Sequence, residues 1–248
     1  MSHASTETET ASKPSGNKML AFLRDVAVIL LSAIVISFLI KTFLVRSFYI
    51  PSASMENTLQ INDRIMVNQL VPKVFSLSRG DVVVFSDPGG WLPGHAQSEN
   101  SQQTPVQQFV DGALSVVGIT APDSDDHLVK RVIGLPGDHV TCCNAEGQVE
   151  VNGVGLDEPY VLKPAGETNN ASTFDTTVPA NSLFVMGDNR YKSRDSRFQT
   201  STPLKGFVPI SNVVGQAFVV TWPLSRWAWL GNYPQTFQDV PAPTNSGQ

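Results

Sequence analysis

The strongest hydrophobic signal in the chain lies near its N-terminus. Residues 26–40 contain no charged side chain, and after Lys41 the apolar character continues to Val45. A helix over residues 26–45 would be about 30 Å long, which matches the hydrocarbon core of a bilayer. Such a helix would be apolar on every face, which argues against a buried core helix. A cleaved signal peptide usually has a shorter apolar run. We therefore predict an uncleaved transmembrane anchor over residues 19–45.

After the anchor, the pattern changes to short runs that are rich in β-branched and aromatic residues. Runs of this kind, bounded by Gly, Pro, Asp or Asn, are typical of strands. They occupy residues 64–69, 81–85, 128–133, 148–151, 182–186 and 213–221. We therefore predict a mainly β fold, in which a single N-terminal transmembrane helix precedes a β-rich domain over residues 46–232.

Three polar segments flank or interrupt these elements. Residues 1–18 lack aromatic side chains, and residues 233–248 are rich in Pro and Gln. Both compositions predict disordered tails. Residues 89–126 are rich in Gly, Pro, Gln, Ser and Asp, and they are too many for an ordinary loop. We expect them to form a surface insertion.

Composition excludes several classes of function. Lys and Arg number 17 against 22 Asp and Glu, which gives a net charge of −5 and excludes a strongly basic nucleic-acid-binding protein. The four His residues are scattered, and the two cysteines form no CxxC pair. We therefore expect no metal site and no cofactor. Because a bond between neighbouring cysteines is strained, Cys142 and Cys143 are predicted to be free thiols.

The remaining residues suggest a serine nucleophile whose base is not a histidine. No histidine lies in a triad-like context, and the chain has no GxSxG motif. Ser52 and Ser54 follow the predicted anchor closely, and in an extended segment they would point the same way. One could then attack while the other donates a hydrogen bond to the developing oxyanion. A Ser-rich turn after a membrane helix is the structural alternative.

Lys130 is the candidate base. In a strand, Leu128, Lys130 and Val132 share one face, so apolar neighbours penalise the charged form of the lysine. A lysine that is neutral near physiological pH can take a proton from a serine. The structural alternative is a lysine on an edge strand, with its ammonium in water.

Together these segments resemble bacterial signal peptidase I. The motifs that carry the resemblance are Ser-x-Ser-Met-x-x-Thr-Leu at 52–59, Lys-Arg-Val-Ile-Gly-Leu-Pro-Gly-Asp at 130–138, Met-Gly-Asp-Asn-Arg at 186–190, and the Ser193, Asp195 and Arg197 that follow. The resemblance covers most of residues 50–223, and the predicted insertion lies outside it. The endoplasmic-reticulum type carries histidine where this chain has Lys130.

The resemblance implies a role for each catalytic residue. Ser54 would be the nucleophile and Lys130 its general base. Ser52 would supply the side-chain half of the oxyanion hole, and Ser193 would hold the amine of Lys130 in line.

The resemblance also implies supporting and substrate-binding residues. Asp188 would pair with Arg131, and Asp195 with Arg197, without taking part in the chemistry. The residues expected to line or flank shallow pockets for small substrate side chains are Ile50, Pro51, Met55, Leu59, Leu128 and Val129.

Two asparagines depart from the family pattern. Asn57 stands where the family often has proline, and Asn62 where it often has glycine. Asparagine tolerates left-handed backbone geometry better than most residues, so we expect the turn to be kept.

The resemblance predicts a membrane-bound serine endopeptidase that removes signal peptides from exported preproteins after small residues, of the Ala-x-Ala type. Its partners would be secretory preproteins and the lipid bilayer, with no nucleic acid and no cofactor. Its β-rich catalytic domain would lie on the extracytoplasmic side of the cytoplasmic membrane of a bacterium. The distribution of lysine and arginine around the anchor favours a cytoplasmic N-terminus only weakly.

Two rival interpretations of the function stay open at this point. One is a non-catalytic, membrane-anchored β-domain that acts as a scaffold, and the other is an inactive homologue. The role of Trp222, Trp227 and Trp229 is also open, because these residues suit either a membrane interface or ordinary packing.

Overall fold

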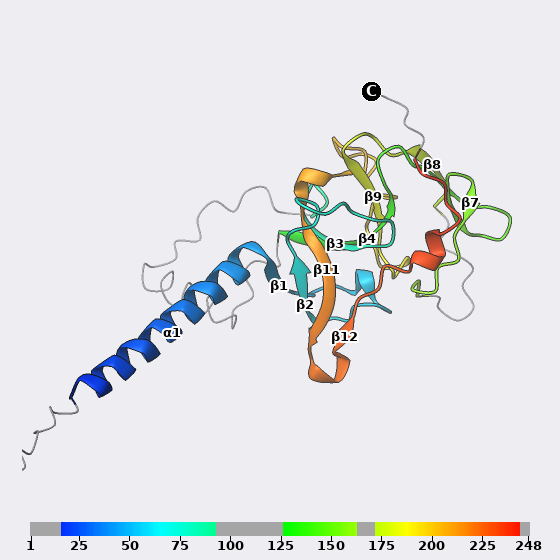
Figure 1. Ribbon diagram of the computed structural model, residues 1–248. Helices are drawn as coiled ribbons and strands as arrows, with labels where there is room; N and C mark the ends of the chain where they lie inside the picture. The colour runs from blue at the N-terminus through cyan, green and yellow to red at the C-terminus, as the bar shows by residue number, and fades with distance from the viewer. Residues whose placement is uncertain (1–15, 93–125, 163–171, 244–248) are drawn as a thin grey trace, which may run out of the picture. The chain divides into compact units, whose positions relative to one another are not determined.

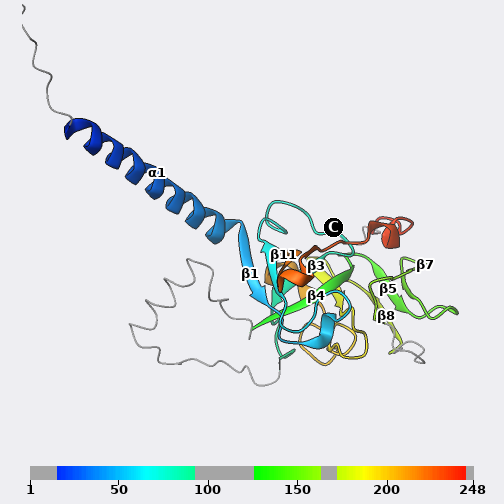
Figure 2. The ribbon, with the colours of Figure 1, turned by 90° about the horizontal axis from the view of Figure 1, so that it is seen from below.

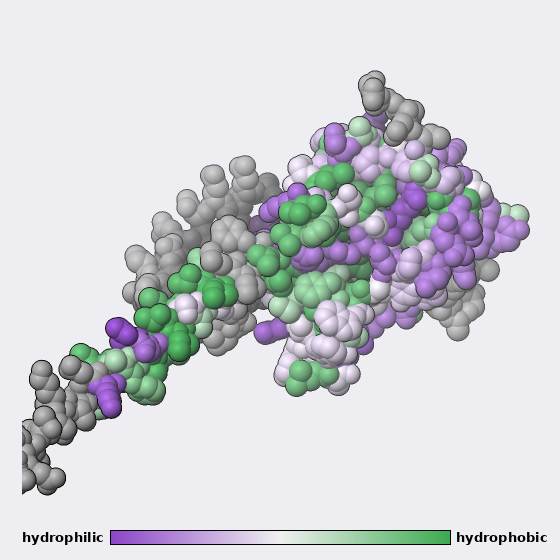
Figure 3. Space-filling model, in the orientation of Figure 1, coloured by the Kyte–Doolittle hydropathy of each residue, from purple (hydrophilic) through white to green (hydrophobic). Residues whose placement is uncertain are grey.

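The computed structural model describes residues 16–92, 126–162 and 172–243 (Figure 1). They belong to two compact units that divide after Ile40. The first unit is most of helix α1 (Gly16–Phe43), in which Lys18–Phe38 is long and apolar enough to cross a membrane and none of the most apolar window is buried. Figure 3 shows this helix with mostly hydrophobic residues on its surface. The helix ends two residues before the predicted anchor does, because Val45 already pairs in a strand.

The second unit is built on two antiparallel sheets. The larger sheet has the order β1 (Val45–Tyr49), β2 (Arg64–Asn68), β11 (Val213–Trp222), β3 (Val82–Ser86), β4 (His127–Gly134), β9 (Ser182–Met186) and β10 (Val208–Pro209), and β12 (Ala228–Trp229) pairs with β11. The smaller sheet has the order β7 (Val154–Gly155), β6 (Val149–Val151), β5 (His139–Cys142) and β8 (Phe174–Thr177). Figure 2 shows β5, β7 and β8 together at one side of this unit. Four 3₁₀ helices complete the described elements: η1 (Ala53–Met55), η2 (Ile210–Asn212), η3 (Leu224–Arg226) and η4 (Pro234–Phe237).

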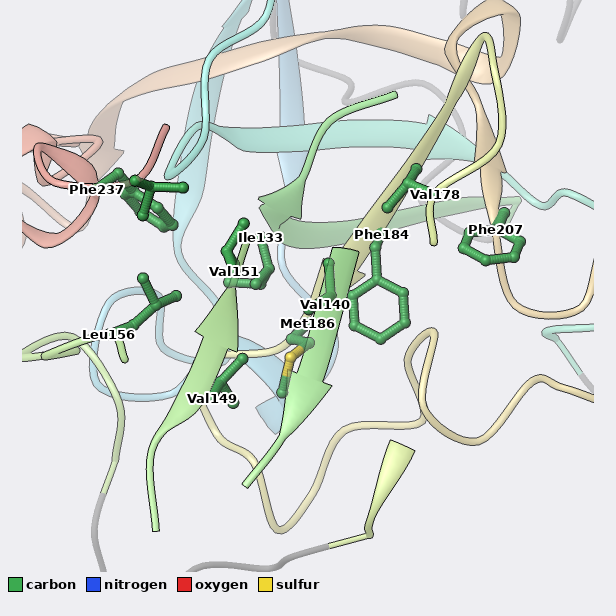
Figure 4. Packing of buried hydrophobic residues seen from close by; sticks show 11 residues of the cluster. Ile133, Val140, Val149, Val151, Leu156, Val178, Phe184, Met186, Phe207 and Phe237 are labelled. Atoms are coloured by element: carbon green, nitrogen blue, oxygen red, sulfur yellow. The ribbon is translucent and has the colours of Figure 1, made fainter. Parts of the chain in front are cut away.

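Side chains of strand β4 pack in three hydrophobic clusters, and this packing holds the strand in place. Its residue Val129 packs against the cluster around Phe48 and Leu59, and Val132 belongs to the cluster around Phe85. Ile133 belongs to a third cluster, which lies between the two sheets and contains Val140, Phe184 and Phe237 (Figure 4). The strand that carries the candidate base therefore has little freedom to move.

The strand predictions are confirmed at all six positions, with ends that differ by no more than one residue. The sequence pattern missed β1, β5 and β8 and the two-residue strands β7, β10 and β12. The two-residue strands β7, β10 and β12 are too short to carry a hydrophobic pattern, and each forms because a longer strand offers it a partner.

The prediction of a disordered C-terminal tail from residue 233 is wrong for residues 233–243. Pro234–Phe237 form η4, and the side chains of Phe237 and Val240 are buried in the cluster between the sheets. The predicted N-terminal tail, residues 1–18, is wrong for residues 16–18, because α1 begins at Gly16. Residues 1–15, most of the insertion and residues 244–248 lie outside the described residues.

The prediction of two free thiols is also wrong. A disulfide bond joins Cys142 and Cys143 across a cis peptide bond.

Candidate active site

Ser54 lies in the short helix η1, directly after β1. The loop around it closes on itself: the Leu59 amide donates to the Met55 carbonyl at 2.7 Å, and the Ile50 amide donates to the Asp63 carbonyl at 2.9 Å. The side chains of Met55 and Leu59 are fully buried in the cluster around Phe48, so the loop is anchored on both sides of η1. Ser54 itself is 8% exposed.

The two asparagines of this loop adopt the left-handed backbone that the sequence analysis expected of them. The φ angle is 90° at Asn57 and 74° at Asn62. The side-chain amide of Asn57 also donates to the Tyr160 carbonyl at 2.9 Å. The backbone at Asn62 is therefore one that glycine would also adopt, whereas the backbone at Asn57 is one that proline cannot adopt.

The side chain of Lys130, from strand β4, contacts the side chain of Ser54. Its Nζ donates to Ser54 Oγ at 2.7 Å and to the Val129 carbonyl at 2.9 Å, and its side chain is 3% exposed. Burial lowers the pKa of Lys130 from 10.5 to about 8, although the charges of Asp195 and Asp188 partly oppose this effect. A buried amine with such a pKa can be neutral at mildly alkaline pH and can then accept a proton.

The other two predicted catalytic serines occupy different positions around this pair. Ser52 is exposed, and its Oγ lies 3.4 Å from Ser54 Oγ. Ser193 is buried, and in the described part of the chain its Oγ makes no hydrogen bond of normal geometry, to Lys130 or any other group. It lies close enough to Asp195 to contribute to lowering the pKa of that carboxyl. The structure thus brings Ser193 to the site without the expected bond to Lys130.

Both predicted ion pairs are present and buried. Arg131 holds Asp188 with two hydrogen bonds, from Nε at 2.8 Å and from Nη2 at 2.7 Å. Arg197 holds Asp195 in the same way, at 2.8 and 2.9 Å. Burial alone would raise the pKa of Asp195, but the hydrogen bonds and charge of Arg197 lower it below its ordinary value. The carboxylate of Asp195 therefore stays charged close to the candidate base.

The segment at residues 186–190 packs directly on the nucleophile loop, which the sequence analysis did not anticipate. The Asn189 amide donates to the Ser54 carbonyl at 3.1 Å. A Cβ atom at Gly187 would lie 2.3 Å from Ser193 Oγ and 2.4 Å from the Ser54 carbonyl oxygen. Only glycine fits between these two groups.

A groove of about 180 Å³ opens beside Ser54 and Lys130. Five of the six residues predicted to bind substrate line it: Ile50, Pro51, Met55, Leu128 and Val129. Leu59 does not, because its side chain is fully buried in the core. The groove has further lining residues that the sequence analysis missed: Phe48, Tyr49, Leu92 and His127. These four residues lie outside the motifs at residues 52–59 and 130–138, so the sequence analysis had no reason to assign them to the groove.

One edge of β4 is available beside this groove. Residues 127–131 pair with β3 on one side, whereas pairing with β9 begins only at Arg131. In the described residues no strand pairs with the second edge of residues 127–130. An extended peptide can pair with such an edge through its main chain.

Within the described ranges, no group of three or more His, Cys, Asp or Glu side chains is arranged to hold a metal ion.

Comparisons with known proteins agree with the motifs. The family model described as "Signal peptidase, peptidase S26" matches residues 23–222. Signal peptidase I of Mycobacterium tuberculosis strain H37Rv is 41% identical over 223 residues, covering 83% of this chain and 74% of its own. The probable signal peptidase I of Mycobacterium leprae is 39% identical over 254 residues, covering 92% of this chain and 86% of its own. A solved signal peptidase I from Enterococcus faecalis V583 aligns with a TM-score of 0.35 and 24% identity, over 57% of this chain and 96% of its own.

Proposed function

This chain belongs to the signal peptidase family, peptidase S26, and from that premise we propose that it works through a serine–lysine dyad. It cleaves signal peptides from preproteins, as its relatives' names state for them. The observation that carries the proposal is the 2.7 Å hydrogen bond between Lys130 Nζ and Ser54 Oγ at the base of a groove.

In the proposed reaction, neutral Lys130 takes the hydroxyl proton of Ser54 while Oγ attacks the carbonyl carbon of the scissile peptide. The tetrahedral intermediate then collapses, and Lys130 passes the proton to the departing amine, which leaves an ester on Ser54. Water, deprotonated by Lys130, attacks this ester, and Lys130 then returns the proton to Ser54 Oγ as the signal peptide leaves with a new carboxylate. The hydroxyl of Ser52, 3.4 Å from Ser54 Oγ, is near enough to stabilise the oxyanion after a small rotation.

The groove supports a preference for small residues before the cut. An extended substrate paired with the edge of residues 128–130 that faces away from β3 would point alternate side chains at the groove wall. The groove is small, and the side chains of Ile50 and Met55 on its wall are themselves buried. Larger substrate side chains would clash with this wall, so selection works by exclusion, as the Ala-x-Ala pattern requires.

We also propose a position at the membrane for the catalytic domain. Helix α1 would anchor the chain in the cytoplasmic membrane of a bacterium, with its apolar stretch Lys18–Phe38 in the bilayer, the N-terminus in the cytoplasm and the β-rich domain on the extracytoplasmic side. Trp222, Trp227 and Trp229 are each more than half exposed, which suits contact with the lipid interface. Protease added to intact spheroplasts should then degrade the domain.

The dyad is tested by cleavage of a preprotein with an Ala-x-Ala site, in detergent, by the full chain. We expect wild type to cut at that site, with a kcat/KM that rises with pH around a midpoint near 8, because only neutral Lys130 accepts the proton. Ser54→Ala and Lys130→Ala should each lower kcat by at least about a thousandfold, since both act in one unit.

Matched substitutions on the exposed residues Ser211 and Lys73 serve as controls, Ser211→Ala and Lys73→Ala. Both should leave cleavage unchanged, and circular dichroism should show that all four variants are folded. A folded Lys130→Ala enzyme that still cleaves at a comparable rate would contradict the proposed mechanism.

A further inference from the structure

We propose that Leu92 determines specificity by contacting the side chain of the third substrate residue before the cleaved bond. The residue directly before that bond is counted as the first. This inference rests on the proposed function, because it assumes that a signal peptide occupies the groove beside Ser54. It assigns a role to the start of the predicted insertion, which no recognised motif covers.

Leu92 sits at the end of a turn that a single carboxylate organises. Asp87 Oδ1 accepts hydrogen bonds from the amides of Gly89 at 2.9 Å and Trp91 at 3.1 Å, and its Oδ2 accepts one from the Leu92 amide at 3.2 Å. The Trp91 side chain is 3% exposed and packs edge-on against Phe85, with the ring centroids 5.6 Å apart. The backbone of Leu92 is therefore held in place from both sides of the turn.

The side chain of Leu92 lines the same groove as Leu128 and Lys130. The turn starts beside the beginning of β4, because Ser86 pairs with His127 and the Asp87 amide donates to the Asp126 carbonyl. Leu92 thus belongs to the end of the groove near His127 and Leu128, away from the base. It is partly exposed, so a bound substrate can reach it.

Strand spacing identifies the substrate residue that meets this end of the groove. Leu128 lies two residues before Lys130 on the same face of β4, which is about 7 Å along the strand. In an extended substrate, the first and third side chains before the cut share one face and have the same spacing. When the first residue lies at Ser54 and Lys130, the third lies level with Leu128 and Leu92.

Leu92 therefore borders the pocket for the third residue, together with Leu128 of β4. A leucine side chain at this position leaves room for alanine or valine in the substrate and clashes with larger side chains. Shortening Leu92 should relax this exclusion, and enlarging it should tighten the exclusion, without affecting the choice of the first residue.

The test measures kcat/KM of the full chain in detergent for preproteins that carry Ala, Val or Leu at the third position before the cut and Ala at the first. For Leu92→Ala, we expect the ratio of Leu to Ala substrates to rise by about tenfold, the discrimination that one or two methylene groups supply in an apolar pocket. For Leu92→Trp, the ratio of Val to Ala substrates should fall by a similar factor.

Because the readout is a ratio, loss of folded enzyme does not change it. Leu204→Ala, an exposed leucine outside the groove, is the matched control and should leave both ratios as in wild type. If wild type cleaves but neither Leu92 variant moves the ratios by more than twofold, the role of Leu92 is refuted while the proposed function stands. If selection changes at the first position instead, the assigned register is wrong. Failure of wild type to cleave any of the preproteins would overturn the proposed function itself.

Discussion

At the scale of a single residue, the burial that lowers the pKa of Lys130 also lowers the stability of the folded protein. Burial lowers its pKa from 10.5 to about 8, so the folded protein holds this proton less tightly than the unfolded chain does. Below pH 8 the folded state must therefore bear a charge that its surroundings disfavour, and the penalty decreases as pH rises from 8 to 10.5. The difference corresponds to about 3 kcal/mol at neutral pH. The proposed base is thus also a destabilising residue, which is common at active sites.

This predicts that Lys130→Met, which keeps the chain volume and removes the charge, stabilises the protein at pH 7 by up to about 3 kcal/mol while abolishing cleavage. The gain should fade as pH approaches 10.5. Denaturant unfolding of the full chain in detergent, measured at pH 7 and pH 10, checks the prediction. Lys73→Met, at an exposed position, should change the free energy of unfolding by less than about 0.5 kcal/mol. Equal stability of Lys130→Met and wild type at pH 7 would argue against the lowered pKa.

At the scale of an element, the connection from β11 to β12 combines packing with exposure. The Trp229 ring stacks on Phe218 with centroids 6.0 Å apart and meets Trp227 edge-on at 5.6 Å. These rings still leave Trp227 54% and Trp229 67% exposed, and Leu224 between the strands is 73% exposed. No acidic residue occurs from Trp222 to Gln238. Figure 3 shows pale and hydrophobic residues at the end of the domain that Figure 1 labels β12. The rings therefore pack on one another and also stay exposed to solvent, and contact with a lipid interface stays a prediction.

For this element we predict that the double variant Trp227→Ala, Trp229→Ala lowers cleavage of a preprotein inserted in liposomes severalfold, because tryptophan at the interface helps to seat the domain. Cleavage of a short soluble peptide in detergent should stay within twofold of wild type. Phe75→Ala, which removes an aromatic side chain that is 56% exposed elsewhere, is the control. An equal loss on both substrates would instead indicate a packing role.

At the scale of the whole molecule, the C-terminal segment binds the two sheets together. The Gly231 carbonyl accepts a hydrogen bond from Arg131 Nη1 at 3.2 Å, next to the proposed base. Further along, the Pro241 carbonyl accepts one from Arg79 Nη2 at 3.0 Å. Phe237 and Val240 between these points are buried with Ile133 of β4. Residues that looked like a tail thus complete the core behind the active site.

We accordingly predict that Phe237→Ala destabilises the protein by about 3–5 kcal/mol, the usual cost of removing a buried aromatic side chain. The neighbouring exposed substitution Gln238→Ala should stay within about 0.5 kcal/mol of wild type. Thermal and denaturant unfolding of the full chain measure both. A value below about 1 kcal/mol for Phe237→Ala would mean that the segment is not part of the cooperative fold.

The sequence alone determined the features that depend on neighbouring residues. An apolar run without a polar face predicts a membrane helix, and β-branched runs predict strands, because both patterns report the burial that each face of an element needs. The left-handed turns at Asn57 and Asn62 and the Asp195–Arg197 pair are equally local. The motifs also identified Ser54 and Lys130, and they led to five of the residues that line the groove.

Only the tertiary structure decided the contacts between distant segments. It joined Ser54 to Lys130 across 76 positions of the chain, brought Leu92 to the groove, buried Phe237 and removed Leu59 from the substrate wall. Polar residues around Phe237 concealed its burial, and the apolar Leu59 suits a core as well as a pocket. Hydrophobic pattern reports that a side chain is buried but not which partner buries it, because the partner is set by how the sheets pack.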